Sequence, residues 1–405
     1  MTAFPSRYMS SPAPDAVARW AARHAGPDDT VVALFGEREA ASFRKTAAVS
    51  SDLAVTLVAG LFPGVIAGGR RRRSGALLFA LPAGTEPSIL DLSDAPDPAD
   101  APDASPFGQN GSASNGHLQN GHARNGRDRN RHRPDAPGSA TRAGTLLAFA
   151  DGRTPNVDGL LHVLRNEWAG GTTVLGGGAG RRNPDAGACL MAEGRLLENA
   201  AVLVPVTAGS GIGVRHGWDR VAGPLVATTA KGNVLHRLNW EPAADVYRRL
   251  LNAHGREGDL PEIGARFPLG MLKQGEEDLI RTPIALGEGG SIVCGGPVPE
   301  HSVLHVLSGT ARGLAGAAKA ACAAAQPAEG AGPPGWFVVE GAHRAAVLGA
   351  KTGVEIEAHS GAETADHPDA QGVMTIGQIA TTRNGTVDWL NGSTVVGAFR
   401  EAEAA

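Results

Sequence analysis

Glycine and proline make up about one residue in five of this chain, and this abundance constrains its fold more than any other feature. The 405 residues include 56 glycines and 27 prolines, whereas the two together make up roughly 12% of an average protein. Both residues break helices, which excludes a helix bundle or a coiled coil as the main architecture. Glycine-containing turns between short apolar runs, at 63–69, 176–180 and 287–291, predict a turn-rich α+β fold instead.

Length and charge limit the class of protein further. A chain of 405 residues exceeds what one hydrophobic core usually serves, so two domains are expected. The formal net charge of −4 provides no general basic surface, so nucleic-acid binding is not expected. The three cysteines are far apart in sequence, which argues against a disulfide scaffold and a cysteine-type zinc site. With no recognisable signal peptide, a cytoplasmic location is expected.

The apolar run at 53–67 could be mistaken for a membrane-spanning segment. It is shorter than the roughly 20 residues that a spanning helix needs, and Pro63-Gly64 interrupts it. A buried strand–turn–strand is therefore predicted, with no membrane segment. The four arginines at 70–73 are interpreted as part of a solvated loop, and an anion-binding patch is the alternative.

Residues 93–143 differ in composition from the rest of the chain. Phe107 and Leu118 are the only large apolar residues there, and asparagine recurs every five residues from Asn110 to Asn130. Such a segment cannot bury enough apolar surface to offset the entropy lost on ordering. It is interpreted as a disordered low-complexity insertion.

On either side of this insertion the same order of elements occurs twice. Residues 30–81 and 145–206 each contain a strand, a helix, a strand, a glycine turn and further strands. This repetition predicts an internal duplication, with mixed sheets flanked by helices and αββα-like layers. Hairpins at 226–238 and 279–294 and helices at 242–254 and 310–325 follow. We therefore expect two domains, at 1–254 and 255–405.

Few residues indicate chemistry by their spacing. The glycines Gly176, Gly177 and Gly178 follow a strand, but no helix can begin cleanly after them, so a structural turn is favoured over a dinucleotide site. His359, Glu363 and His367 have helical spacing, yet Gly361 and the proline at 368 favour a mobile polar loop over a metal site. No nucleophile with its base can be assembled, so an enzyme is not expected.

Three charged residues and one histidine remain candidates for a ligand site. Arg281, Glu340 and Arg344 lie beside apolar strands, where an unpaired charge is costly. They are interpreted either as structural Arg–Glu pairs or as arginines that bind a ligand carboxylate. His216 precedes Gly217-Trp218 and is interpreted as a structural histidine, with a haem axial ligand as the alternative.

Several segments, in their order along the chain, resemble the FIST family, which pairs an N-terminal with a C-terminal FIST domain. HGWDRVAGPLVATTAKGNVLHRLNWEPAADVYRRLL at 216–251 resembles the family's run from a Gly-Trp through a Gly-Asn hairpin to a Pro-Ala helix start. GTTVLGGGAG at 171–180 resembles the N-terminal domain. FPLGM at 267–271, GVMTIGQIA at 372–380 and LNGSTVVGAF at 390–399 resemble the C-terminal domain. The resemblance covers about residues 15–92 and 144–400.

The chain departs from the family pattern at two positions. Glu340 lies in the strand where the family often has cysteine, and Gly377-Gln378 replaces a common Gly-Glu. If a ligand touches these side chains in the family, this chain is expected to bind a different ligand or none.

The resemblance implies a sensory module that binds a small molecule, such as an amino acid or its derivative, and signals in trans to a partner such as a histidine kinase. It implies no catalysis and no cofactor, with a haem-based nitric-oxide sensor or an interaction scaffold as alternatives. The expected ligand-binding residues are Gly176, Gly177, Gly178, His216, Trp218, Arg281, Glu340, Arg344 and Gln378.

Overall fold

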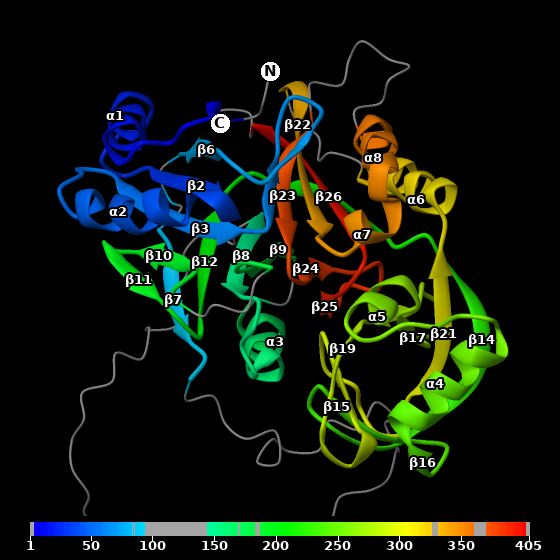
Figure 1. Ribbon diagram of the computed structural model, residues 1–405. Coiled ribbons are helices and arrows are strands. Elements are labelled where there is room, and N and C mark those ends of the chain that lie inside the picture. Colours follow the sequence, from blue (N-terminus) through cyan, green and yellow to red (C-terminus); the bar gives the residue numbers. More distant parts are fainter. Residues whose placement is uncertain are drawn as a thin grey trace, which may run out of the picture.

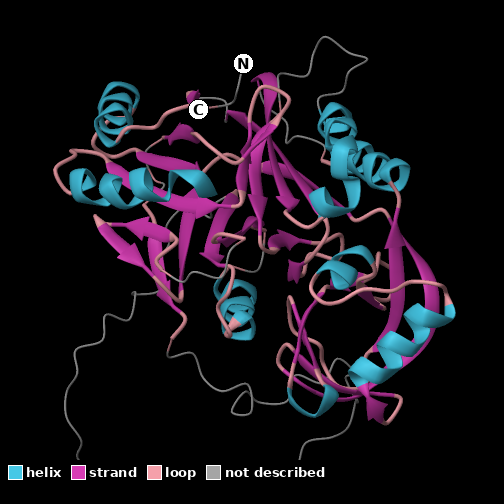
Figure 2. Cartoon of the chain, viewed as in Figure 1, coloured by secondary structure: helices cyan, strands magenta, loops and turns pink. Residues whose placement is uncertain are grey.

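The computed structural model of the chain contains four sheets, with most helices on the outside (Figures 1 and 2). It describes residues 4–82, 84, 86–93, 144–168, 171–182, 187–325, 331–359 and 370–401. Almost all of the predicted insertion at 93–143 lies outside the described residues. The mixture of helices and mixed sheets confirms the predicted α+β class.

Three of the sheets are built on one repeated unit. In the first unit the parallel strands β2 and β3 are connected by α2, and β6 lies antiparallel to β2. Strand β1 completes one edge beside β6. The elements of this unit are β1 (Ser6–Met9), α1 (Pro14–His24), β2 (Thr30–Gly36), α2 (Ala40–Ser50), β3 (Thr56–Phe62), β4 (Gly64–Ile66), β5 (Arg71–Arg72) and β6 (Ala76–Leu81), with a 3-10 turn at Glu37–Glu39.

The second unit repeats this order, as the sequence predicts. Parallel β8 and β9 are connected by α3, and β12 and β7 follow on one side. The side chain of Asn156 caps α3 by accepting a hydrogen bond from the backbone of Gly159 (2.9 Å). The elements are β7 (Ser88–Asp91), β8 (Thr145–Asp151), α3 (Val157–Glu167), β9 (Thr173–Ala179), β10 (Leu190–Ala192), β11 (Arg195–Leu197) and β12 (Ala200–Val206).

A third copy, which the sequence analysis missed, lies in the C-terminal half. Parallel β22 and β23 are connected by short helices, and β26 and β13 follow on one side. The elements are β13 (Ser210–Arg215), α6 (Ala311–Ala324), β22 (Ala331–Gly341), α7 (Arg344–Leu348), α8 (Thr352–His359), β23 (Gln371–Thr375), β24 (Gln378–Thr381), β25 (Val387–Leu390) and β26 (Thr394–Glu401), with a 3-10 turn at Gly349–Lys351.

Each unit gives a short hairpin to the sheet of another unit. The β4–β5 hairpin of the first unit pairs with β23 of the third, and the β10–β11 hairpin of the second pairs with β3 of the first. The β24–β25 hairpin of the third unit pairs with β9 of the second, which closes the cycle. Strands from both sides of residue 254 therefore share two of these three sheets.

A fourth sheet is inserted in the third unit between β13 and α6. Long, bent β14 and β21 form its centre, and α4 packs against it through buried Val246, Tyr247 and Leu251. The predicted hairpin at 226–238 and the helix at 242–254 belong here. The elements are β14 (Trp218–Lys231), β15 (Val234–Leu238), β16 (Glu241–Pro242), α4 (Ala243–Ala253), α5 (Glu262–Arg266), β17 (Leu269–Met271), β18 (Leu279–Arg281), β19 (Pro283–Leu286), β20 (Ile292–Cys294) and β21 (Val303–Gly309), with a 3-10 turn at Glu288–Gly290.

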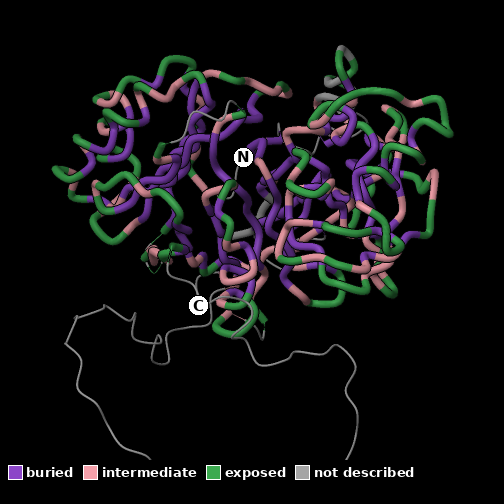
Figure 3. Tube along the Cα trace, turned by 60° about the horizontal axis from the view of Figure 1, so that its bottom comes forward, coloured by how far each residue is buried: buried purple, intermediate pink, exposed green. Residues whose placement is uncertain are grey.

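The largest buried apolar cluster lies where the three units meet. It contains residues such as Val32, Phe149 and Val339, one from the first parallel strand of each unit. Buried backbone runs through this centre, and exposed backbone follows the periphery (Figure 3). Parallel strands covered on both faces read as continuous apolar runs, which explains sequences such as TVVALFG.

Two predictions about local structure are wrong. Gly176, Gly177 and Gly178 lie inside strand β9 and not in a turn. A Cβ atom at Gly177 would lie 2.5 Å from the carbonyl oxygen of Gly377, so glycine allows β24 to approach closely. The arginines at 70–73 do not form a solvated loop, because Arg71 and Arg72 form β5 and the Arg71 side chain is only 9% exposed.

Candidate functional site

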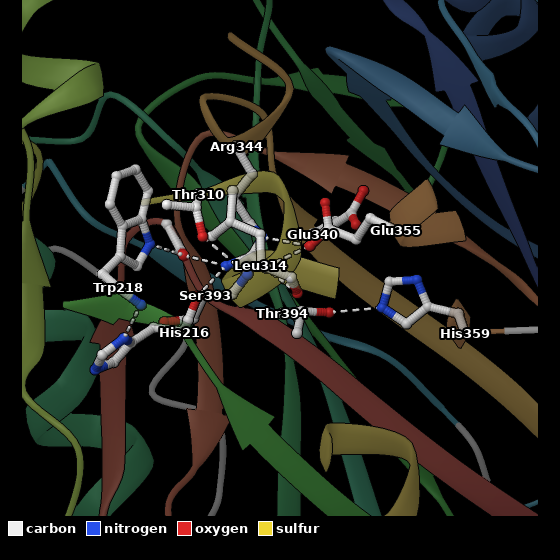
Figure 4. Close-up of polar contacts among 12 residues, drawn as sticks. His216, Trp218, Thr310, Leu314, Glu340, Arg344, Glu355, His359, Ser393 and Thr394 are labelled. Atoms are coloured by element: carbon white, nitrogen blue, oxygen red, sulfur yellow. Dashed lines mark hydrogen bonds and ion pairs between the residues drawn. The ribbon is translucent and has the colours of Figure 1, made fainter. Parts of the chain in front are cut away.

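The predicted site residues gather around one short segment, residues 389–394, which connects β25 to β26. The carbonyl oxygen of Gly392 accepts hydrogen bonds from Trp218 Nε1 (2.9 Å) and from Arg344 Nη1 (2.6 Å). Figure 4 shows Trp218 and Arg344 approaching this point from different elements. Residues more than a hundred positions apart in sequence are thereby joined at one backbone atom.

Gln378 and Arg281 contact the same segment at its neighbouring residues. Gln378 Oε1 accepts a hydrogen bond from the backbone nitrogen of Ser393 (3.1 Å), and Arg281 Nη1 donates to the carbonyl oxygen of Trp389 (3.0 Å). Arg281 is 4% exposed and also donates to two other backbone carbonyls. Burial lowers the pKa of its guanidinium to about 10. It therefore holds backbone in place, and it forms no ion pair with a carboxylate of the described residues.

Arg344 begins helix α7 and is fully buried. Its guanidinium pairs with Glu355 (Nε to Oε1, 2.7 Å) and donates to the carbonyl oxygens of His216 (2.6 Å) and Leu314 (3.2 Å). Because these acceptors and the Gly392 carbonyl come from four separate segments of the chain, Arg344 fixes the junction between the third unit and the inserted sheet. The interpretation as a structural ion pair holds for Arg344, but its partner is Glu355 and not Glu340.

Glu340 pairs instead with Arg71, from the hairpin of the first unit. Arg71 Nε donates to Glu340 Oε2 (2.5 Å), and Arg71 Nη2 donates to Glu355 Oε2 (2.5 Å). Two guanidiniums and two carboxylates therefore form one buried network across two units. Burial and the nearby Glu340 carboxylate raise the pKa of Glu355. The Glu340 Oε1 atom is buried and has no hydrogen-bond partner among the residues that the structure describes.

His216 connects this network to the inserted sheet. Its Nδ1 accepts a hydrogen bond from the backbone nitrogen of Trp218 (2.9 Å), so the proton of the neutral ring is on Nε2. Nε2 faces the Glu277 carboxylate at 3.9 Å, and the backbone nitrogen of His216 donates to the same carboxylate (2.9 Å). Burial lowers the pKa of His216, which keeps the ring neutral.

His359 is a member of the site that the sequence analysis assigned to a loop. It ends helix α8, is 4% exposed, and its Nε2 contacts Thr394 Oγ1 (2.9 Å) (Figure 4). Burial lowers its pKa to about 4. Glu363 and His367, the other members of the proposed metal motif, lie outside the described residues. Within the described ranges, no cluster of three potential metal ligands occurs.

The glycines of β9 lie close to the same segment. Gly177 pairs with Gln378 in the sheet, and a Cβ atom at Gly178 would lie 3.0 Å from the Trp389 ring. Trp389 in turn donates from Nε1 to the carbonyl oxygen of Gly295 (2.8 Å). The structure therefore brings all nine predicted residues into one region. Arg71, Glu355 and His359 were missed because their partners lie far away in sequence.

A polar cavity of about 790 Å³ lies beside the 389–394 segment. His216 and Ser393 border it, so the cavity touches the hydrogen-bonded region described above. Its other walls come from β13, from residues 275–279 and from the β24–β25 connection at 381–383. Among the sequence candidates, only His216 lines this cavity.

The charged groups in the cavity wall are only partly paired. Asp278 accepts two hydrogen bonds from Arg220 (2.6 and 2.7 Å), and Glu276 pairs with Lys273 (2.5 Å). Both carboxylates are therefore neutralised by the protein itself. The other charged residues of the wall therefore determine what the cavity can bind.

Arg215, Arg383 and Glu277 are those remaining charges. The Arg215 guanidinium donates to a backbone carbonyl (2.6 Å), and Arg383 is exposed with no carboxylate partner in the described part of the chain. The Glu277 side chain is 44% exposed. The cavity lining therefore includes two guanidiniums that can bind an anion and a carboxylate that can bind a cation.

Haem does not fit this region. Nδ1 of His216 already accepts a hydrogen bond, Nε2 carries the proton, and the cavity wall is rich in carboxylates and guanidiniums. A haem pocket needs a free imidazole nitrogen and apolar contacts for the macrocycle. The residues present therefore do not favour His216 as an axial ligand.

Comparison with protein families finds two models that together span most of the chain. The FIST N domain matches residues 30–241, and the FIST C domain matches residues 243–381. The chain belongs to the FIST family. FIST domains are sensory domains of signal-transduction proteins, and they are not known as catalytic domains. The two matches meet at residue 242, inside the inserted sheet.

Other comparisons add little to the FIST assignment. No curated protein matches the chain significantly. Among the described residues, no helix combines the length and the apolar character needed to cross a membrane.

Proposed function

We propose that this FIST protein is a cytoplasmic sensor that binds an amino acid or a close derivative in the 790 Å³ cavity. It acts through binding and not through catalysis. The observation that carries the proposal is that Arg215, Arg383 and Glu277 line the cavity and form no arginine–carboxylate pair in the described part of the chain. Arg215 and Arg383 suit an α-carboxylate, and Glu277 suits an α-ammonium group. The remaining volume accommodates a side chain or a further substituent.

His216 offers a route from the cavity to the rest of the molecule. Its backbone nitrogen donates to Glu277 in the cavity wall, and its carbonyl oxygen accepts from Arg344 in the buried network. Arg71 continues that network into the first unit. A ligand that draws Glu277 toward its ammonium group would favour one arrangement of these contacts over another. The signal would then pass in trans to a partner such as a histidine kinase.

Isothermal titration calorimetry of the full chain against single amino acids tests the proposal. We expect binding that weakens at least tenfold in Arg383→Gln and in Glu277→Gln. Ligand analogues distinguish the two walls: an amino-acid amide lacks the carboxylate and should be insensitive to Arg383→Gln, whereas an N-acetyl amino acid should be insensitive to Glu277→Gln.

The exposed Arg248, which pairs with Asp245 on helix α4, supplies the matched control. Arg248→Gln should bind as the unaltered protein does. If no amino acid or derivative binds, or if both cavity variants bind as tightly as the original chain, the proposal is wrong.

A further inference from the structure

A second, smaller pocket lies between the first and second units, and its lining residues differ from those of the 790 Å³ cavity. It has a volume of about 200 Å³ and lies at the carboxyl ends of the parallel strands β8 and β9. The carboxyl ends of parallel strands are the usual place for ligands in such sheets. The two pockets share no lining residue. The polar residues of this one include Arg44, Asp151, Arg153, Arg181, Glu198 and Asn199.

The three units allow a direct comparison of this position. An acidic residue lies at or next to the end of the first parallel strand in each of them: Glu37, Asp151 and Glu340. In the first unit Glu37 pairs with Arg73 (2.5 Å) and Arg182 (3.2 Å). In the third, Glu340 pairs with Arg71. Arginine–carboxylate pairs therefore occupy this junction in both units.

In the second unit, other contacts stabilise the acidic residue, Asp151. Asp151 accepts hydrogen bonds from the backbone nitrogens of Arg153 (3.0 Å) and Asn199 (3.1 Å). Two main-chain donors thus help to stabilise its charge. Some arginines near this junction do not pair with it in the described part of the chain.

Arg44 and Arg181 are two such arginines. Arg44 projects from helix α2 of the first unit and Arg181 follows β9, and neither makes an ion pair within the described ranges. Arg153 Nη2 donates to the carbonyl oxygen of Arg181 (2.5 Å), which holds the backbone of Arg181 at the pocket. Glu198 is an exposed carboxylate at the rim. Two arginines and one exposed glutamate therefore line the same pocket.

We propose that this pocket binds a small oxyanion, a carboxylate or a phosphate, between Arg44 and Arg181. Guanidinium groups bind both kinds of oxyanion through paired N–H donors. The pocket has space for about seven water volumes at ~30 Å³ each, which suits a small anion better than a nucleotide. Because Arg44 belongs to the first unit and Arg181 to the second, the anion would join the two units.

Calorimetric titration of the full chain with inorganic phosphate and, separately, with succinate tests this proposal at constant ionic strength. We expect at least one of these anions to bind, and binding to weaken tenfold or more in Arg44→Gln and in Arg181→Gln. Comparison of the two titrations distinguishes phosphate from carboxylate as the preferred group. Both arginines lie at the surface, and a circular-dichroism melt verifies that the variants fold.

Two further variants separate this pocket from its alternatives. Glu198→Gln should bind the anion as tightly as the original chain or more tightly, because a repulsive charge is removed. Arg383→Gln, in the larger cavity, should have no effect. The proposal is overturned if neither anion binds, if Arg44→Gln and Arg181→Gln bind normally, or if binding is lost in Arg383→Gln instead.

Discussion

At the scale of single residues, the buried network around Arg344 determines much of the site's character. Two guanidiniums and two carboxylates balance each other in a region where an unpaired charge would cost several kcal/mol. Sequence analysis identified Arg344 and Glu340 as buried charges that need partners. It could not identify the partners, because Arg71 lies about 270 positions before Glu340 and only the exchanged hairpin brings them together.

The pH dependence of stability tests the burial of His359. Its pKa is about 4 in the folded protein and about 6.5 in an unfolded chain. The unfolded state therefore binds the proton more readily, so stability falls as the pH decreases from about 6.5 toward 4. Between pH 7 and pH 5 this histidine should account for about 2 kcal/mol of lost stability.

Urea unfolding of His359→Gln at pH 7 and pH 5 measures this contribution. A glutamine amide can still reach Thr394, yet it does not titrate. The variant should lose less stability on acidification than the original chain, whereas exposed His162→Gln should behave as the original does. An unchanged pH dependence in His359→Gln would show that His359 is not buried as described.

At the scale of elements, glycines in the strands allow an exchanged hairpin to pack closely against the sheet that receives it. Sequence analysis identified the strand before Gly176 but ended it too early, because a glycine run usually indicates a turn. In the structure the glycines let β9 lie against β24 and the Trp389 ring. Only the three-dimensional neighbour, which the local sequence does not specify, explains why no side chain is tolerated there.

Alanine substitutions at two glycines should have opposite effects. A Cβ atom at Gly377 would lie 2.3 Å from the Trp389 ring, so Gly377→Ala must displace the tryptophan. We expect a loss of about 1–3 kcal/mol, as for an overpacked core. Gly316, inside helix α6, has open space around it, so Gly316→Ala should stabilise by roughly 0.5–1 kcal/mol.

Chemical denaturation of both variants checks this contrast. If the Gly377→Ala variant were as stable as the original chain, Gly377 would not be packed tightly against Trp389 as described. Gly316→Ala then shows whether the measurement can detect a change of the expected size.

At the scale of the whole molecule, the same connection is enlarged in different ways in the three units. Between the edge strand and the first parallel strand, the first unit has helix α1, the second has residues 93–143, and the third has the inserted sheet and α6. Sequence analysis predicted the duplication from residues 30–81 and 145–206. It missed the third copy because the inserted sheet lies between β13 and β22 and interrupts the repeated order of elements.

Replacing residues 95–142 with a twelve-residue glycine–serine linker should preserve the fold. Strands β7 and β8 both pair with β12, at Ala200 and Val206 respectively, so the connection must cover roughly 20 Å along the strands and about 10 Å across them. Twelve flexible residues suffice for this distance. Thermal unfolding should remain cooperative, with a midpoint close to that of the full chain.

The binding assays described above provide the second measurement for this variant. Both pockets are lined by residues outside 95–142, so amino-acid and anion binding should be unchanged. Loss of cooperative unfolding would show that the insertion contributes to the core.

The exchange of hairpins also sets an order of assembly during translation. The β10–β11 hairpin finds β3 already synthesised, but β4–β5 must wait for β23, some three hundred residues later. Until then Val65 and Ile66, which are fully covered in the finished protein, have no sheet to join. A nascent chain that stops before residue 371 therefore has no partner for the β4–β5 hairpin, and the first unit can be closed by the third only after the C-terminal strands have begun to be made.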